Sequence, residues 1–145
     1  MRIYLDNCCY NRPYDDQSQL RIYLESQAKM AVQTKIRQGE IELVTSYMNF
    51  YESSANPYEM RRVNIQRFLQ DYATVHVSEQ MDDCVLEKVT AIENTGIKHK
   101  DACHVACAVL ADCDFFLTTD DRLLKYKSDE IELLNPVTFI NLLEG

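Results

Sequence analysis

The sequence lacks tryptophan, long apolar runs and any segment of low complexity, and its 145 residues include only three glycines and three prolines. Its apolar runs are a handful of residues long, well short of the about 20 that cross a bilayer. The opening residues, MRIYLDNCCY, contain an aspartate and no extended apolar stretch, which is unlike a secretory signal peptide. With no linker or repeat to divide it, the chain is predicted to form a single domain over residues 1–145, cytoplasmic and without a membrane partner.

Basic residues are also few. Fifteen lysines and arginines stand against 23 aspartates and glutamates, for a formal net charge of −8. Affinity for nucleic-acid phosphates comes mainly from lysine and arginine, so the chain as a whole is a poor general nucleic-acid binder. Any nucleic-acid role would therefore depend on a few local basic residues or on bound cations. The hydrophobic share of 46% is that of a folded protein and argues against intrinsic disorder.

The six cysteines include no C-x-x-C pair, and without a secretory signal they are expected to be reduced thiols. His99, Cys103 and Cys107 recur every four residues and could share one helix face, which is one way to hold a metal ion. A structural zinc ion generally takes four ligands, however. We therefore favour the simpler interpretation, in which Cys103 and Cys107 are small buried residues of a packed helix.

Short apolar segments alternate along the chain with longer segments of helical periodicity. The predicted strands cover residues 2–5, 41–46, 73–77, 115–117 and 131–134. The predicted helices cover residues 17–37, 47–55, 58–72, 79–95 and 101–111, with a last one from residue 137. This alternation is typical of an α/β domain built around a mainly parallel sheet.

Four acids stand at or beside the junctions of these elements. Asp6 directly follows the first strand, and Asp120 follows the fourth. Glu52 lies on the helix after the second strand, and Asp101 opens the apolar helix before the fourth. Ligands of an open α/β sheet bind beyond the carboxyl ends of its strands, so these acids can face one crevice.

Carboxylates gathered in one place repel one another unless a cation balances them, and oxygen ligands suit Mg²⁺ or Mn²⁺. Two such ions can activate a water and stabilise the leaving oxygen of a phosphodiester, so the pattern indicates a nuclease. Each acid also has an ordinary structural explanation. Asp101 could stabilise its helix through the macrodipole, and Asp120 with Asp121 could form a turn.

Three segments resemble the signature regions of PIN-domain proteins, a family that includes the VapC-type toxins of bacterial toxin–antitoxin pairs. They are LDNCCYN near the start, MNFYESSAN in the middle and KDACHVACAVLADCDFFLTTDDRLL near the end, and NPVTFINLL resembles the family's final strand-to-helix junction. The resemblance covers almost the whole chain in the right order. It implies a three-layer α/β/α sandwich and a ribonuclease that depends on Mg²⁺ or Mn²⁺. It also implies an RNA substrate, an antitoxin partner and a homodimer.

The resemblance further assigns individual residues. The family's catalytic and metal-binding acids fall on Asp6, Glu52, Asp101 and Asp120. Asn7 stands where a hydroxyl-bearing residue often follows the first acid, and it can still hydrogen-bond a metal-bound water or a phosphate. Thr118 matches the threonine of the family's T-x-D motif, which favours Asp120 over Asp121 as the ligand. The predicted phosphate contacts are Asn11, Arg12 and Arg122.

The sequence leaves the roles of several other side chains undecided. His104 lies one turn after Asp101 and either touches the site or is a satisfied core residue. Three arginines of the 58–72 helix form either a solvated face or a surface for RNA, an antitoxin or a second copy, namely Arg61, Arg62 and Arg67.

The predicted activity is hydrolysis of RNA that leaves a 3′-hydroxyl and a 5′-phosphate. One alternative is a catalytically weak PIN-fold module that acts through protein or RNA binding. A second is a phosphatase or phospho-acceptor domain with Asp6 as nucleophile, which is disfavoured because position 8 is a cysteine rather than a second aspartate.

Overall fold

Five parallel strands form one sheet in the computed structural model, which describes residues 1–79 and 82–145. The strands are β1 (Arg2–Leu5), β2 (Glu42–Ser46), β3 (Ala73–Val77), β4 (Phe115–Leu117) and β5 (Glu132–Leu134), in the spatial order β3-β2-β1-β4-β5. All four neighbouring pairs run parallel, as predicted. The chain adds β2 and β3 on one side of β1 and then returns to add β4 and β5 on the other. The strand order therefore reverses between β1 and β4, which is where open α/β sheets bind ligands.

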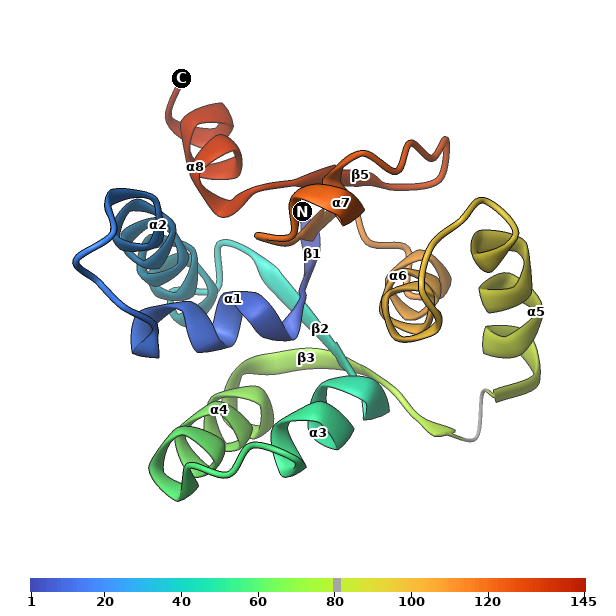
Figure 1. The fold of residues 1–145 in the computed structure, drawn as a ribbon, viewed down its shortest axis with the longest axis horizontal. Coiled ribbons are helices and arrows are strands. Elements are labelled where there is room, and N and C mark those ends of the chain that lie inside the picture. Colours follow the sequence, from blue (N-terminus) through green and yellow to red (C-terminus); the bar gives the residue numbers. More distant parts are fainter. Residues whose placement is uncertain (80–81) are drawn as a thin grey trace.

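Helices cover both faces of the sheet (Figure 1). They are α1 (Asn7–Asn11), α2 (Leu20–Arg37), α3 (Tyr47–Ser54), α4 (Glu59–Tyr72), α5 (Asp82–Glu93), α6 (His99–Leu110), α7 (Asp121–Leu124) and α8 (Pro136–Glu144), with a 3₁₀ turn η1 (Arg12–Tyr14) after α1. One core cluster joins α5 and α6 to one face, and the other joins α1, α2, α4 and α8 to the opposite face. This is the predicted three-layer α/β/α sandwich.

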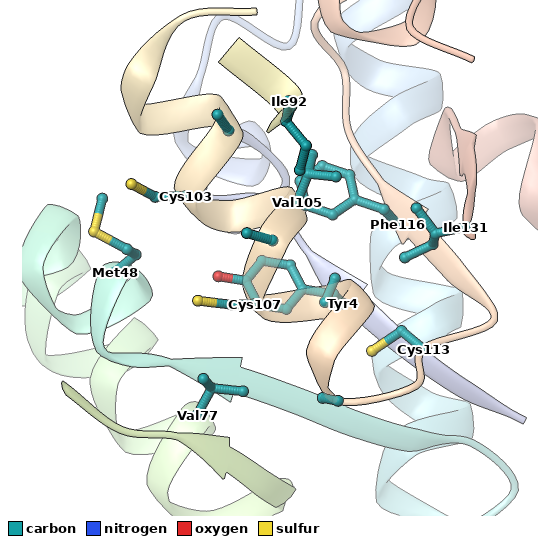
Figure 2. Packing of buried hydrophobic residues seen from close by; sticks show 14 of the residues in the cluster. Tyr4, Met48, Val77, Ile92, Cys103, Val105, Cys107, Cys113, Phe116 and Ile131 are labelled. Carbon is teal, nitrogen blue, oxygen red and sulfur yellow. The ribbon is translucent and has the colours of Figure 1, made fainter. Parts of the chain in front are cut away.

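Side chains of β1 alternate between the two cores, as they must in a strand buried on both faces. Ile3 and Leu5 belong to the cluster with α2 and α4, whereas Tyr4 belongs to the cluster with α6. The Tyr4 ring stacks on Phe116 of β4 at a centroid distance of 5.3 Å. Figure 2 shows both rings packed beside α6.

The cysteines of α6 are buried in that core, which confirms the simpler interpretation of their spacing. Cys103 is 5% exposed and Cys107 is fully buried. Cys103 Sγ lies 3.6 Å from Nε2 of His99. No helix within the described ranges is both long enough and apolar enough to cross a membrane.

Several helix boundaries differ from the sequence prediction. Helix α2 begins at Leu20 rather than residue 17, because Oδ1 of Asp16 accepts hydrogen bonds from the Ser18 backbone N–H and hydroxyl and holds a turn there. Helix α6 begins two residues before Asp101, which therefore lies in its first turn. The prediction missed α1 and α7, whose five and four residues are too few to show a periodicity. Residues 80–81 of the helix predicted at 79–95 lie outside the described residues.

A buried carboxylate joins α2 to its neighbours. Glu25 is 2% exposed and accepts hydrogen bonds from Nε of Arg12 (2.8 Å), Nε of Arg21 (3.2 Å) and the side-chain amide of Asn135. Both arginines are more exposed than the acid, at 20% and 52% of their side chains. The cluster therefore connects η1, α2 and the start of α8.

Replacing this carboxylate by an amide is expected to destabilise the protein. Glu25→Gln keeps the side-chain shape but removes the charge that three donors share, so we expect a loss of about 1.5 kcal/mol in the free energy of unfolding. Urea unfolding measures it. Glu40→Gln is the matched control, because Glu40 makes only a 3.5 Å surface contact with Lys35. Equal stabilities of the two variants would contradict the prediction.

Candidate active site

The end of β1 is fastened to the end of β4, and this places two of the predicted residues together. Leu5 pairs with Leu117, and the Asp6 N–H donates to the Leu117 carbonyl at 2.9 Å. Asp6 is 7% exposed, and its two carboxylate oxygens are both held. Oδ1 accepts from the Asn7 N–H at 2.8 Å, and Oδ2 accepts from the Thr118 hydroxyl at 2.9 Å. Thr118 is therefore a positioning residue for Asp6.

All four predicted acids line one open groove of about 470 Å³, at the carboxyl ends of the central strands. Asp6 follows β1, Glu52 comes from α3, Asp101 from the first turn of α6, and Asp120 precedes α7. We call this the acidic groove. The other side chains that line it are those of Cys8, Lys98, His99 and Lys100.

The acids differ in how much of each carboxylate is already engaged. Asp120 caps α7, with Oδ1 accepting from the backbone N–H groups of Arg122 (2.9 Å) and Leu123 (3.4 Å). Oε1 of Glu52 lies 2.8 Å from Nε2 of His104. No hydrogen bond reaches the Asp101 carboxylate from the described part of the chain. Asp101 and the second oxygens of Asp120 and Glu52 are thus the least engaged donors in the groove.

The four acids lie close enough in the groove for the charges of three of them to affect the pKa of Asp101. The pKa of Asp101 is raised, first by burial and then by the negative charges of Asp6, Asp120 and Glu52, although His104 opposes the shift. Burial also acts to raise the pKa of Glu52, but the hydrogen bond and charge of His104 outweigh it and leave that pKa lowered. Of these two acids, Asp101 is therefore the one whose negative charge the surrounding protein compensates less.

A buried chain of hydrogen bonds runs from Glu52 through His104 and Tyr4 to Ser46. His104 is fully buried, and its Nδ1 lies 2.6 Å from the Tyr4 hydroxyl, which lies 2.6 Å from Oγ of Ser46. Because a carboxylate can only accept, Nε2 of His104 donates to Glu52. Burial lowers the pKa of His104, but the hydrogen bond to Glu52 and the nearby acids outweigh it, so the pKa is raised. Both sequence-based interpretations of His104 therefore hold, since it is a satisfied core residue that touches the site.

The sequence prediction missed Cys8 and the basic residues of the groove. The Cys8 thiol lies 3.4 Å from both Oδ2 of Asp6 and Oγ1 of Thr118. Lys98 and Lys100 are exposed, and the charge of Lys100 contributes to the lowered pKa of Glu52. The sequence K-H-K-D could have indicated these two lysines, because Lys98 and Lys100 lie within three residues of the predicted ligand Asp101.

Asn7 and Asn11 lie near the groove without lining it. The Asn7 side chain donates to the Asn49 carbonyl (3.2 Å) and the Ser53 hydroxyl (3.3 Å), and it accepts from Nδ2 of Asn49 (2.7 Å). It thereby fastens α1 to α3. The Asn11 amide donates to the Asn7 carbonyl at 3.0 Å and accepts from Asn56 at 3.1 Å.

The predicted basic contacts also lie outside the groove lining. Arg12 pairs with Asp15 and Glu25, while Arg122 is exposed on α7. Asp121, the alternative to Asp120, forms two 2.8 Å hydrogen bonds with Arg21 and does not line the groove.

The three arginines of α4 each make a different contact. Arg61 lies over the Tyr58 ring at 4.1 Å, Arg62 donates to the Asn56 carbonyl at 2.9 Å, and Arg67 lines a different pocket.

The donor chemistry of the groove fits a hard divalent cation. Its carboxylates offer oxygen ligands, and after burial the negative charges of Asp6, Asp120 and Glu52 contribute to the raised pKa of Asp101. Among the residues that the structure describes, no three His, Cys, Asp or Glu side chains are grouped closely enough to hold one metal ion together. Mg²⁺ keeps several waters and takes only one or two direct carboxylates in many sites, so the donor set is compatible with an ion held partly through water.

The sheet order, the flanking helices and the acidic groove at the switch point define a PIN-like α/β protein. The structure is similar to that of VapBC2 from Rickettsia felis, which was solved bound to a DNA fragment from the VapBC2 promoter. The TM-score is 0.57 and the sequence identity 12%, and the match covers 93% of this chain and 98% of that one. It is also similar to FitAcB from Neisseria gonorrhoeae, with a TM-score of 0.59 and 15% identity over 92% and 97% of the two chains. Identities this low establish the fold alone, and the predicted PIN-like fold is confirmed. No family model and no curated protein matches the sequence.

Proposed function

We propose that this protein is a metal-dependent endoribonuclease that hydrolyses phosphodiester bonds of RNA. The observation that carries the proposal is the meeting of Asp6, Glu52, Asp101 and Asp120 in one groove at the switch point of the sheet. These acids are up to 114 residues apart in the chain, and three of them raise the pKa of the fourth. Such a concentration of negative charge opposes phosphate binding unless a cation balances it.

The chain's own residues would divide the work between them. Asp101 and Asp120 offer the least engaged carboxylate oxygens and would hold Mg²⁺ or Mn²⁺, together with Asp6 and Glu52, directly or through water. Thr118 keeps the Asp6 carboxylate in place, and His104 does the same for Glu52. A bound cation would acidify an attacking water and stabilise negative charge at the scissile phosphate.

The two lysines of the groove would bind RNA phosphates beside the acids. Lys98 and Lys100 are exposed, line the groove and are the basic side chains nearest to Asp101 in the sequence. Each phosphate contact releases counterions from the RNA, so we expect Lys98→Ala and Lys100→Ala each to raise KM severalfold and to reduce the dependence of log KM on log salt by about 0.7. Steady-state cleavage at several salt concentrations measures both quantities. Lys35→Ala on α2 is the control, and an identical salt dependence in all three variants would contradict this assignment.

Cleavage of RNA by the metal-stripped protein, with and without added Mn²⁺, tests the proposed activity. We expect new RNA ends with 5′-phosphates only when Mn²⁺ or Mg²⁺ is present, and no products from the Asp6→Asn protein. Binding of RNA without cleavage in either metal would instead favour a PIN-fold binding module. Trapping of a phosphorylated Asp6 would favour the phospho-acceptor alternative.

An antitoxin partner and a homodimer belong to the same proposal. Both follow from the sequence resemblance to VapC-type toxins, and the fold shared with VapBC2 and FitAcB also supports the antitoxin partner. Light scattering on the purified chain measures the homodimer directly, and the expected mass is twice 16.9 kDa.

A further inference from the structure

A second pocket, separate from the acidic groove, is lined by residues of α2 and α4 and by the α1–η1 segment. Its volume is about 440 Å³, and its lining shares no residue with that of the acidic groove. That volume is within the range of small-molecule sites in proteins. We call it the α2–α4 pocket.

The charge of the α2–α4 pocket is opposite to that of the protein as a whole. Lys29, Arg37 and Arg67 line it, against the single acid Asp71, although the chain carries a net charge of −8. No salt bridge within the described ranges joins any of these three cations to an acid. The pocket therefore concentrates positive charge that the protein itself does not neutralise by ion pairing.

Lys29 is the most unusual of the three cations because it is buried. Its side chain is only 7% exposed, and its ammonium group donates to the neutral amide oxygen of Gln33. The same nitrogen lies 5.5 Å from the ring centre of Tyr10 and 5.7 Å from that of Phe68. Burial lowers the pKa of Lys29 to about 8. A buried ammonium group with neutral partners is costly, and a bound anion would offset that cost.

Tyr10 adds a second, independent observation that points to a ligand. Its residue is 1% exposed, and its hydroxyl has no hydrogen-bond partner in the part of the chain that the structure describes. Buried polar atoms nearly always have a partner in folded proteins. Tyr10 lines the same pocket as Lys29, and the Lys29 ammonium group lies 5.5 Å from its ring centre, so both unusual side chains belong to one pocket wall.

We propose that the α2–α4 pocket binds a small organic phosphate that carries a flat ring, such as a nucleoside monophosphate. Three cations against one acid match the double charge of a phosphate monoester better than the single charge of a carboxylate. Lys29 and Tyr10 supply donors for the phosphate, and Arg37 and Arg67 supply further charge. The aromatic side chains Tyr14, Phe68 and Tyr72 form walls suited to a ring.

Calorimetric titration of the whole protein with adenosine 5′-monophosphate tests this proposal, in a chelating buffer at constant ionic strength. We expect saturable binding with one site per chain, weaker binding of inorganic phosphate, and no binding of adenosine. Lys29→Met is expected to weaken the affinity by at least about tenfold. Lys35→Met is the matched control, because it removes a cation from the same helix outside the pocket lining, and it should leave the affinity unchanged.

Tyr10→Phe provides a second variant that removes one atom and keeps the ring. It is expected to weaken binding severalfold while the circular dichroism and unfolding curve remain those of the parent protein. This variant keeps the proposal testable if Lys29→Met does not fold.

Three outcomes would overturn the proposal. The first is no saturable binding of the nucleotide up to about 10 mM. The second is nucleotide binding that both Lys29→Met and Tyr10→Phe leave unchanged, since the ligand would then lie outside the α2–α4 pocket. Loss of binding in Asp101→Asn would likewise place the ligand in the acidic groove. The third is equal affinity for the nucleotide, inorganic phosphate and sulfate, which would indicate a non-selective anion contact.

Discussion

Asp101→Asn is expected to lower the rate of RNA cleavage by about a thousandfold, equivalent to about 4 kcal/mol of transition-state stabilisation, and at the same time to stabilise the metal-free protein. The loss of activity follows because the Asp101 carboxylate accepts no hydrogen bond from the residues that the structure describes. Both of its oxygens are therefore available to bind a cation. The gain in stability follows because burial, and then repulsion by Asp6, Asp120 and Glu52, disfavour that charge in the folded state. An amide removes the repulsion and keeps the side-chain shape.

The two effects are measured on the same protein samples. Single-turnover cleavage in Mn²⁺ gives the loss of rate, and thermal unfolding in a chelating buffer should show a melting temperature a few degrees higher for the variant. Asp121→Asn is the matched control, because Asp121 is the neighbour of Asp120, pairs with Arg21 and does not line the groove. A variant that cleaves RNA like the parent protein would show that Asp101 has no part in the reaction.

The stability gain should also depend on pH in a defined direction. Because the pKa of Asp101 is raised above its usual value of 3.8, its ionised form opposes folding of the metal-free protein. The penalty is fully present above the folded-state pKa and disappears as the pH falls from that value towards 3.8. The difference in melting temperature between Asp101→Asn and the parent should therefore shrink on acidification. A difference that grows as the pH falls would contradict this explanation.

His104→Phe is expected to weaken Mn²⁺ binding by about 10- to 100-fold, although His104 itself is not a ligand in this account. The ring donates to Glu52 from a fully buried position and fixes where that carboxylate lies. Phenylalanine fills a similar space and removes the donor. Groups that orient a metal ligand in this way affect metal affinity through the ligand they hold.

Two further variants separate this positioning role from general damage to the core. Tyr4→Phe removes the hydroxyl at the other end of the chain but leaves the contact between His104 and Glu52, so it should change Mn²⁺ affinity much less. His104→Gln restores a donor and should recover part of the loss. Calorimetry with Mn²⁺ measures all three variants, and unchanged affinity in folded His104→Phe would exclude the positioning role.

The sequence alone was sufficient to predict where the strands lie and which acids follow them. Asp6 and Asp120 were identifiable because each comes at or just after the end of a short apolar strand, and parallel strands share one carboxyl edge. Spacing did not show that β1 and β4 are neighbours, which is what brings Asp6 beside Thr118. That step depended on the resemblance, since it concerns strand order rather than local pattern.

Residues whose role depends on distant partners were not predictable in the same way. Arg12 is a cation close to the first acid in the sequence, but the buried carboxylate of Glu25 binds it in the folded chain. The contact of His104 with Tyr4 joins residues 100 positions apart. Lys29 had no sequence signal at all, because its burial results from how α2 and α4 pack around it.

A calorimetric titration of metal-stripped protein with Mn²⁺ tests the central claim most directly, namely that acids from separate parts of the chain form one cation site. The account predicts saturable binding to the parent protein and weaker binding to both Asp6→Asn and Asp101→Asn. Asparagine at position 6 can still cap α1, so the first of these variants should keep its fold. Mn²⁺ affinity that both substitutions leave unchanged, or no binding at millimolar Mn²⁺, would contradict the claim.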